Sequence, residues 1–384
     1  MKIDKLKNPI KNKKTILSVG PMSQNCIDAA LEISESSKIP LQFIPSRRQI
    51  ESRELGGGYV NNWTTEEFSK YVKEKSTSDN IFLSRDHGGP WQNNEEKKSI
   101  TTYKDALNSS LSSFKEDILS GFDFLHIDTS IDINKQISSE EATNRACELL
   151  YLCVDFAKTE NREIYFEIGT ELQSEGINDI KEVKENLEII KLFCHKNKIS
   201  PPFFYVIQNG AKVLEMENVG IFESETNKDF TNEYEEIKKI NKICNDYGIY
   251  TKAHNSDYLS KEYSEMYPKL GINGANIAPE FGVIETLTYL EIFNNFDLSE
   301  EKEVFLNISY NSEKWQKWLK PNSTTSDYEK SVISGHYVFS NEEFQDLKSK
   351  VKTKLSHSID IDKEIKKNIK NKINFYLESF GWFG

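Results

Sequence analysis

The sequence predicts a (β/α)8 TIM barrel, a closed ring of eight parallel strands with helices outside, followed by a helical C-terminal extension. Eight short apolar runs alternate with helix-length charged or amphipathic segments over roughly 290 residues, which is the repeat count of this fold. Several runs also end abruptly in polar residues, as barrel strands do where they carry chemistry. An open doubly wound sheet is the alternative, but no G-x-G-x-x-G motif follows the first strand.

The predicted strands are rich in β-branched and aromatic residues and are bounded by turn-forming residues. They cover residues 15–19, 41–44, 81–83, 122–127, 164–168, 203–207, 249–253 and 274–278. The predicted helices show the spacing of an amphipathic helix or dense charge. They cover residues 24–36, 65–73, 101–119, 139–158, 179–196, 232–245, 260–267 and 283–293.

The pattern changes after Asp297, which sets the predicted boundary between a barrel over residues 1–297 and an extension over residues 298–384. The second part contains no strand pattern. Its helix-like segments lie at 301–305, 313–319, 341–355 and 361–380. We expect this extension to pack on the barrel rather than to form a separate catalytic domain.

Composition excludes several classes of protein. The net charge is −12 and no basic stripe interleaved with aromatic residues occurs, so a nucleic-acid partner is not expected. No apolar run is long enough to cross a membrane, so no membrane partner is expected either. Five scattered cysteines without a C-x-x-C pair indicate free, mostly buried thiols and a cytoplasmic location.

Two of only six histidines come at the ends of predicted strands: His87 follows strand three and His254 follows strand seven. Glu167 on strand five and Asp128 at the end of strand four supply carboxylates nearby. Two imidazoles and a carboxylate are the ligands of a catalytic divalent metal, most commonly Zn2+. The alternative is that both histidines only form hydrogen bonds in a polar cavity. His126 lies deeper in strand four, where we expect a core hydrogen bond and not a metal ligand.

Several short motifs resemble one known family when taken in chain order. They are Asp86-His87-x-Gly-Pro-Trp-Gln92, His126-Ile-Asp128-x-Ser130, Ile168-Gly-Thr-Glu171, Gln208-x-Gly210, Ala253-His254-x-x-Asp257-Tyr258 and Pro279. Together they look like the tagatose-bisphosphate aldolase class II accessory-subunit family, whose members are called non-catalytic and partner a class II ketose-bisphosphate aldolase. The resemblance implies a TIM barrel and an aldolase subunit or a second copy of the chain as partner.

That family is similar in turn to the catalytic class II aldolases, in which zinc polarises a ketose carbonyl. The resemblance implies an acid/base role for Asp86, ligand roles for His87 and His254, and an alternate ligand role for Glu167. Asp128 also has a counterpart in those enzymes. Phosphate is expected on the strand-seven and strand-eight loops. The candidate substrate and phosphate residues at the strand ends are Ser130, Gln208, Asn209, Asn255, Ser256, Asp257 and Asn276.

The chain also departs from these enzymes. Gln208-Asn209 stands where they have a third histidine ligand on strand six. Pro279-Glu280 replaces an Asp-Thr pair after strand eight, and the Glu280 carboxylate would repel a phosphate unless it points away. These departures indicate a divergent member of the family, whose substrate need not be tagatose bisphosphate.

Three functions follow from these residues. The first is a metal-dependent lyase that cleaves a phosphorylated ketose through a stabilised enediolate, with Asp86 as one acid/base and Glu171 or Glu175 as the second. The second is a non-catalytic subunit that stabilises a class II aldolase. The third is a sugar-phosphate isomerase or epimerase at the same site, because an enediolate can be reprotonated instead of cleaved.

Overall fold

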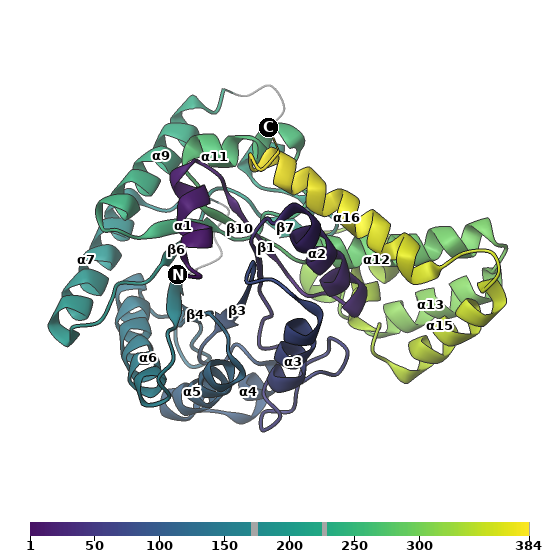
Figure 1. Ribbon diagram of the computed structural model, residues 1–384, viewed down its shortest axis with the longest axis horizontal. Helices are drawn as coiled ribbons and strands as arrows, with labels where there is room; N and C mark the ends of the chain where they lie inside the picture. The colour runs from purple at the N-terminus through teal and green to yellow at the C-terminus, as the bar shows by residue number, and fades with distance from the viewer. Residues whose placement is uncertain (170–175, 225–228, 384) are drawn as a thin grey trace.

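The computed structural model describes residues 1–169, 176–224 and 229–383 and shows a closed parallel barrel. Its strands follow the order β1-β10-β9-β6-β5-β4-β3-β2, so neighbours in sequence are neighbours in space and β1 closes onto β10 (Figure 1). The predicted fold class is therefore confirmed, and all eight predicted strands are present. Their bounds are Ile16–Val19 (β1), Leu41–Phe43 (β2), Ile81–Gly88 (β3), Phe124–Asp128 (β4), Tyr165–Gly169 (β5), Phe204–Ile207 (β6), Tyr250–Ala253 (β9) and Gly274–Ile277 (β10).

The outer helices begin at polar residues that cap free backbone N–H groups, which is why the charged segments become helical where they do. Side-chain caps come from Ser23, Thr64, Thr102, Ser138 and Asp179. The helices of the barrel are Gln24–Ser37 (α2), Thr65–Lys75 (α3), Asn94–Ser99 (α4), Tyr103–Ser120 (α5), Ser139–Thr159 (α6), Ile180–Asn197 (α7), Ile221–Ser224 (α8), Thr231–Asp246 (α9), Lys261–Ser264 (α10), Met266–Leu270 (α11) and Pro279–Asn295 (α12).

Several short elements were not predicted, among them the helices α4 and α8 and the helix at residues 327–334. Two others bear on the barrel. A short helix, α1 (Asp4–Lys11), places Leu6 and Ile10 among Phe82, Phe124 and other aromatic residues at the N-terminal ends of the strands. It closes the bottom of the barrel, where it lies across the strands in Figure 1. The second is a two-residue hairpin between β7 (Val213–Leu214) and β8 (Glu217–Asn218), which follows β6.

The C-terminal extension is helical, as predicted. It contains α13 (Ser299–Asn311), a 3-10 turn η1 (Gln316–Trp318), α14 (Asp327–Ser334), a second 3-10 turn η2 (Gly335–Tyr337), α15 (Glu342–Leu355) and α16 (Ile361–Ser379). The segment 313–319 was expected to form a helix but yields only the turn η1, because Trp315 Nε1 bonds back to the Tyr310 carbonyl (2.9 Å) and Pro321 blocks continuation.

The last helix returns to the barrel. In Figure 1, α16 runs from the lobe formed by α13 and α15 back along α2 and α12, with which it is in contact. At its end, Trp382 Nε1 donates to the Thr15 carbonyl (2.8 Å) and Thr15 N donates to the Phe380 carbonyl (3.2 Å). The extension thus packs on the barrel over a long helix, while the boundary at residue 297 stays a prediction.

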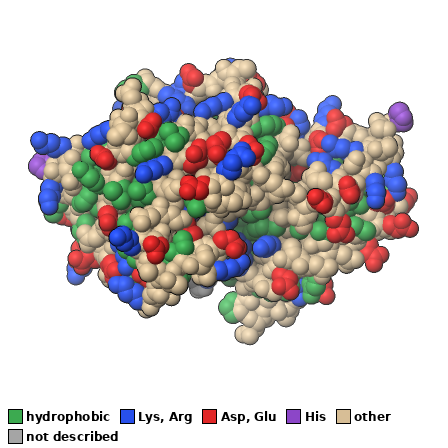
Figure 2. Space-filling view, turned by 90° about the horizontal axis from the view of Figure 1, so that it is seen from below, with side chains coloured by type: hydrophobic (Ala, Val, Ile, Leu, Met, Phe, Trp, Pro, Cys, Tyr) green, Lys and Arg blue, Asp and Glu red, His purple; other side chains and the backbone are tan. Residues whose placement is uncertain are grey.

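Charged side chains are interspersed over the face shown in Figure 2, without a single-sign stripe. No helix among the described residues is both long and apolar enough to span a membrane. The five cysteines are all free and buried, as predicted.

A buried ion pair fixes the end of β3. Arg85 lies wholly out of solvent and its guanidinium makes two bonds to the Asp117 carboxylate of α5 (2.5 and 2.9 Å). The same guanidinium donates to the carbonyls of Ile50 (2.6 Å) and Pro45 (3.2 Å) and to Thr65 Oγ1 (3.2 Å). Arg85 therefore ties β3, the segment after β2, α3 and α5 together directly beneath the barrel mouth.

Asp117→Asn should lower the free energy of unfolding by about 3–5 kcal/mol, because it leaves the Arg85 charge buried without its partner. The measurement is urea unfolding followed by circular dichroism. The control is Glu74→Gln, which removes an exposed carboxylate 3.8 Å from Lys70 and should change stability by less than about 0.5 kcal/mol. Equal losses in the two variants would show that the buried pair does not hold this region.

Candidate functional site

Three imidazoles meet at the C-terminal mouth of the barrel. One nitrogen from each of His87 (β3), His126 (β4) and His254 (after β9) lies within 4.8 Å of the other two. The ring centroids are 5.0–5.3 Å apart. His87 and His254 were predicted to converge here. His126 was expected to serve only as a core hydrogen-bonder, but its ring belongs to the same cluster.

The local backbone of β3 explains how two consecutive residues enter one site. Strand alternation would send Asp86 and His87 to opposite faces. Instead, the register with β4 shifts between Arg85 and Gly88, and His87 adopts φ 43°. A left-handed conformation is costly for a residue with a side chain and is found at functional sites when the surrounding structure enforces it. Both side chains consequently face the mouth.

Asp128 orients His87. Its Oδ2 accepts a 2.8 Å bond from His87 Nδ1 and another from Gln92 Nε2 (2.8 Å), and its Oδ1 accepts from Ser130 N (3.0 Å) and Oγ (2.6 Å). Because the carboxylate is ionised, the imidazole proton belongs on Nδ1 and the lone pair on Nε2. Metal-binding histidines are commonly held in this way. Asp128, which was predicted as a metal ligand, is in the structure the hydrogen-bond partner of His87.

His126 is fully buried and its Nδ1 accepts the backbone N–H of His87 (3.1 Å). The same nitrogen lies 3.5 Å from Asp86 Oδ1. The sequence did contain a signal for its position, since His126, Asp128 and Ser130 alternate along one strand and share its inward side. The core hydrogen bond predicted for His126 is therefore present, and its ring lies in the cluster as well.

Asp86 is the carboxylate at the centre of the cluster. It lies 3.5–3.9 Å from nitrogens of all three histidines and accepts a bond from Asn276 Nδ2 (3.2 Å). Burial opposes its ionisation, but His87, His126 and His254 outweigh that effect and hold the pKa of Asp86 well below its usual range. Burial drives the pKa of His254 well below its usual value, so this imidazole is neutral and offers a lone pair. Imidazole nitrogens beside a carboxylate are a donor set that fits a divalent transition metal.

Glu167 does not join the histidines. Its carboxylate forms a fully buried ion pair with Lys252 Nζ (2.8 and 3.0 Å) and accepts from Ser84 Oγ (3.2 Å). Lys252 precedes His254 by two residues and so shares its inward side. The sequence analysis did not consider this lysine. In the structure the predicted metal ligand Glu167 is the counter-ion of Lys252.

Four of the seven predicted substrate residues fall into two groups. Asn276 and Ser130 contact the acidic side chains of the cluster, as described above. Asn209 and Ser256 instead bond to tyrosines: Asn209 Nδ2 to Tyr263 (3.2 Å) and Tyr267 (2.9 Å), and Ser256 Oγ to Tyr267 (2.9 Å).

Three further predicted residues lie near the end of β6 and after β9. Gln208 is buried, and its side-chain Nε2 makes no hydrogen bond to the residues that the structure describes. Asn255 adopts φ 57° and its carbonyl accepts from Asn218 Nδ2 (3.0 Å). Asp257 is considered below. The predicted acid/base residues Glu171 and Glu175 lie outside the described residues.

The sequence matches one family model, described as D-tagatose-1,6-bisphosphate aldolase subunit GatZ/KbaZ-like, over residues 3–200. The chain belongs to this family. The matched part carries His87, His126 and Asp128, whereas His254 and the C-terminal extension lie beyond it. No curated protein matches the sequence.

Several solved structures share the fold at low sequence identity. The crystal structure of a probable tagatose 6 phosphate kinase from Sinorhizobium meliloti 1021 aligns with a TM-score of 0.77 at 16% identity, covering 95% of this chain and 100% of that one. A fructuronate-tagaturonate epimerase from Cohnella laeviribosi aligns with a TM-score of 0.58 at 10% identity (96% and 81% covered). A fructose-bisphosphate aldolase from Campylobacter jejuni gives 0.53 at 12% identity (98% and 92%).

The Pro279-Glu280 pair, which follows β10 in place of Asp-Thr, affects the start of α12. Glu280, expected to repel a phosphate, points away from the mouth: it accepts from Tyr376 (2.5 Å) and Tyr258 N (2.8 Å) and pairs with Lys372 (2.7 Å). Asp257 Oδ1 accepts the N–H groups of Ala278 and Glu280 (both 2.9 Å) at the start of α12. The N-terminus of α12 is therefore already occupied by the protein's own carboxylate.

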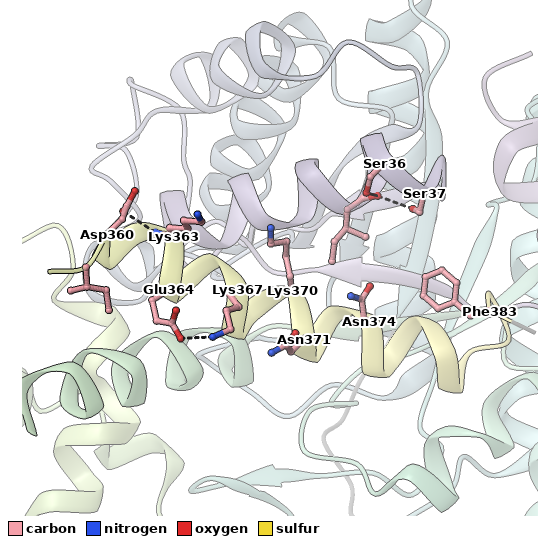
Figure 3. Close-up of a pocket in the computed structure, with 12 residues that line it drawn as sticks. Ser36, Ser37, Asp360, Lys363, Glu364, Lys367, Lys370, Asn371, Asn374 and Phe383 are labelled. Atoms are coloured by element: carbon pink, nitrogen blue, oxygen red, sulfur yellow. Dashed lines mark hydrogen bonds and ion pairs between the residues drawn. The ribbon is translucent and has the colours of Figure 1, made fainter. Parts of the chain in front are cut away.

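A cavity of about 880 Å³ lies elsewhere, between α2 and α16, and is lined by Ser36, Lys363, Lys367 and Asn374 among others. In Figure 3 these side chains project from the outer surfaces of the two helices, and Lys367 pairs with Glu364 (2.8 Å). None of the candidate site residues lines it, so it adds nothing to the chemistry at the mouth.

Burial and the neighbouring Glu280 raise the pKa of Asp257 to about 8. The folded protein thus keeps a proton that the unfolded chain releases above about pH 4, and stability falls as pH rises toward 8. Asp257→Asn should remove this loss while keeping an acceptor for the two N–H groups. Its stability relative to wild type should rise by about 1 kcal/mol per pH unit between pH 5 and 7.

The measurement is urea unfolding at pH 5, 6 and 7, with Asp79→Asn as the control because Asp79 is exposed. The control should follow the wild-type profile. Parallel profiles for wild type and Asp257→Asn would contradict the shifted titration.

Proposed function

We propose that the chain is a metal-dependent lyase that cleaves a phosphorylated ketose, with a divalent cation held by His87, His126 and His254. The observation that carries the proposal is the convergence of three imidazole nitrogens within 4.8 Å around the Asp86 carboxylate. Three histidines and an open position form a common catalytic zinc set. The identity of the metal as Zn2+ and a cytoplasmic location are part of the proposal.

The ligand set proposed here differs from the one that the family resemblance implied. There, the third imidazole was sought on strand six, where Gln208 and Asn209 stand. His126 supplies an imidazole from β4, so the change on strand six does not by itself argue against metal binding. Glu167 is left out of the set because Lys252 neutralises its carboxylate (2.8 Å).

A bound divalent cation would supply Lewis-acid stabilisation of the negative charge that develops on the sugar's carbonyl oxygen. The protein's own groups would do the rest. Asp128 would keep the His87 ring oriented through the 2.8 Å bond to Nδ1. Asp86, ionised and anchored by Asn276, would accept the proton of the sugar hydroxyl that lies β to the carbonyl.

In the proposed cleavage, Asp86 takes the hydroxyl proton, and the electron pair of that O–H bond becomes the new C=O bond of the aldehyde product. The C–C bond between the hydroxyl-bearing carbon and its neighbour breaks, and its electron pair remains on the ketone fragment. That fragment then takes up one proton at carbon, for which Glu171 or Glu175 remains the predicted donor.

A second candidate function is that of an accessory subunit, because the family description names a subunit of D-tagatose-1,6-bisphosphate aldolase. In that role the chain would stabilise a separate class II aldolase and turn over no substrate. An isomerase or epimerase would use the same residues, with the proton returned to the sugar before the C–C bond breaks. The fold is shared with both an aldolase and an epimerase, so it does not separate these reactions.

His87→Ala and His126→Ala should each lower the metal content, measured by inductively coupled plasma mass spectrometry, from about one ion per chain to a small fraction. Release of triose phosphate from D-tagatose 1,6-bisphosphate should fall by at least ~100-fold, since the Lewis-acid contribution is worth several kcal/mol. The matched control is His195→Ala, which removes an exposed histidine on α7. Retained metal in both cluster variants would overturn the proposed site.

A double variant, Glu167→Gln with Lys252→Met, tests the revised ligand set. Removing both partners avoids leaving one buried charge unpaired. If Glu167 is not a ligand, the double variant should retain the metal that His126→Ala loses. Loss of metal from the double variant, together with a folded circular dichroism spectrum, would return Glu167 to the ligand set.

The subunit function predicts a different result. A tagged copy of the chain should co-purify with a class II aldolase from the same cells and raise the midpoint of that enzyme's thermal inactivation. The His87→Ala variant should do so equally well, because a stabilising role does not need the cluster. A chain that cleaves substrate alone, without any co-purifying aldolase, would exclude a purely accessory role.

A further inference from the structure

Three cations near the mouth of the barrel form no ion pair with the residues that the structure describes. Arg48 follows β2, Lys97 lies on α4 and Lys317 lies in η1 of the C-terminal extension. None of them pairs with a carboxylate of the described residues, whereas the neighbouring Arg47 and Arg85 are fully paired.

Packing contacts connect the three segments that carry Arg48, Lys97 and Lys317. Arg47 pairs with Glu96 (2.6 Å), which brings the residues after β2 against α4 and so places Arg48 and Lys97 beside them. Arg47 also donates to the Gly89 carbonyl (3.0 Å), immediately after the His87 strand. The buried Arg47–Glu96 pair therefore holds together the two segments that carry Arg48 and Lys97.

The third cation, Lys317 of the C-terminal extension, is connected to the Arg48 segment by two tyrosines, Tyr59 and Tyr337. Tyr59 N donates to the Arg48 carbonyl (3.2 Å), and the Tyr59 ring packs on Tyr337 with centroids 4.9 Å apart. Lys317 Nζ lies 5.3 Å from the centre of the Tyr337 ring and 4.5 Å from that of Trp318. Trp318 Nε1 donates to the Tyr337 hydroxyl (3.2 Å) and fixes this ring. The Tyr59–Tyr337 pair thus connects the segment that carries Arg48 to the one that carries Lys317.

The electrostatics show that the three charges act on one another. The pKa of Lys97 is lowered by loss of hydration and then by Arg48 and Lys317, and is raised by Asp128. The pKa of Lys317 is lowered by loss of hydration and by Arg48, against an opposing effect of Tyr337. The influence of Asp128 on Lys97 puts this lysine within electrostatic range of the carboxylate that holds His87. Like charges gathered without counter-ions are stabilised by an anion.

Two further observations favour a ligand at this place. The Tyr258 hydroxyl is buried and makes no hydrogen bond to the residues that the structure describes, and the Tyr337 ring influences its pKa. The alternative anion site, the N-terminus of α12, is filled by Asp257 (2.9 Å to two N–H groups). A bound anion would have to displace that carboxylate.

We infer that Arg48, Lys97 and Lys317 form the binding site for the terminal anionic group of the sugar, a phosphate or a carboxylate. The sugar would extend from this site toward the histidine cluster, past Asp128. Because Lys317 comes from η1, the C-terminal extension contributes directly to substrate binding. As a statement about the sugar, the inference rests on the proposed function, but anion binding can be measured without turnover.

The test is isothermal titration calorimetry of the full-length protein with four probes: inorganic phosphate, D-tagatose 6-phosphate, D-tagaturonate and D-tagatose. Wild type should bind at least one anionic sugar more tightly than D-tagatose, and added NaCl should weaken only the anionic ligands. Arg48→Gln and Lys317→Gln should each weaken anion binding by ~10-fold or more and leave D-tagatose unchanged. The anionic sugar that loses more affinity identifies the group as phosphate or carboxylate.

The matched control is Lys98→Gln, next to Lys97 on the same helix, where the lysine already pairs with Glu95 (2.7 Å). It should bind all four probes like wild type. The inference is overturned if both site variants, folded by circular dichroism, bind the anionic sugars as tightly as wild type, or if wild type does not prefer them to D-tagatose. Metal content is measured in the same samples: its absence from wild type would refute the proposed function and leave the anion result standing.

Discussion

The end of β3 depends on a buried guanidinium. Arg85 points outward from the barrel and meets Asp117 (2.5 Å) and the carbonyl groups of the segment after β2. Asp86 and His87, which follow Arg85, are the candidate acid/base and metal-binding residues. Any movement of this strand end would change where Asp86 and His87 lie, so a fully desolvated ion pair beneath the mouth serves to hold them in place. Such pairs contribute more to positional specificity than to net stability.

The charged residues near the mouth form separate groups. The Glu167–Lys252 pair lies within the barrel and neutralises itself (2.8 Å). Beside it, three imidazoles surround the single carboxylate of Asp86, and a second carboxylate, Asp128, holds one imidazole from outside. This arrangement brings one nitrogen of each imidazole within 4.8 Å of the other two, a spacing that suits a shared cation.

The C-terminal extension affects the mouth from two sides. Tyr376 and Lys372 of α16 hold Glu280 away from the site, and Asp257 occupies the start of α12 in place of a ligand. On the other side, η1 and η2 bring Lys317 and Tyr337 to Tyr59. The family match ends at residue 200, so the features that would select the sugar's anionic end lie partly outside the segment that identifies the family.

The order of strands and helices could be read from the sequence because both depend on local patterns: apolar alternation, capping residues and turn residues. The same patterns placed Asp86, His87 and His254 at strand ends. They failed for α1, whose few apolar residues are buried only because the barrel bottom exposes a ring of aromatic side chains. They also failed at 313–319, where a side-chain bond from Trp315 and Pro321 limit the helix to one turn.

Long-range geometry decided the remaining features of the site. The sequence by itself determined which residue types end each strand, since that follows from chain order. Only the tertiary structure decided that the register shift and φ 43° turn His87 beside Asp86, that His126 completes the cluster, and that Lys252 takes Glu167 out of it. Each of these depends on which side chains from different strands meet across the barrel, and residue spacing along one strand contains no information about that.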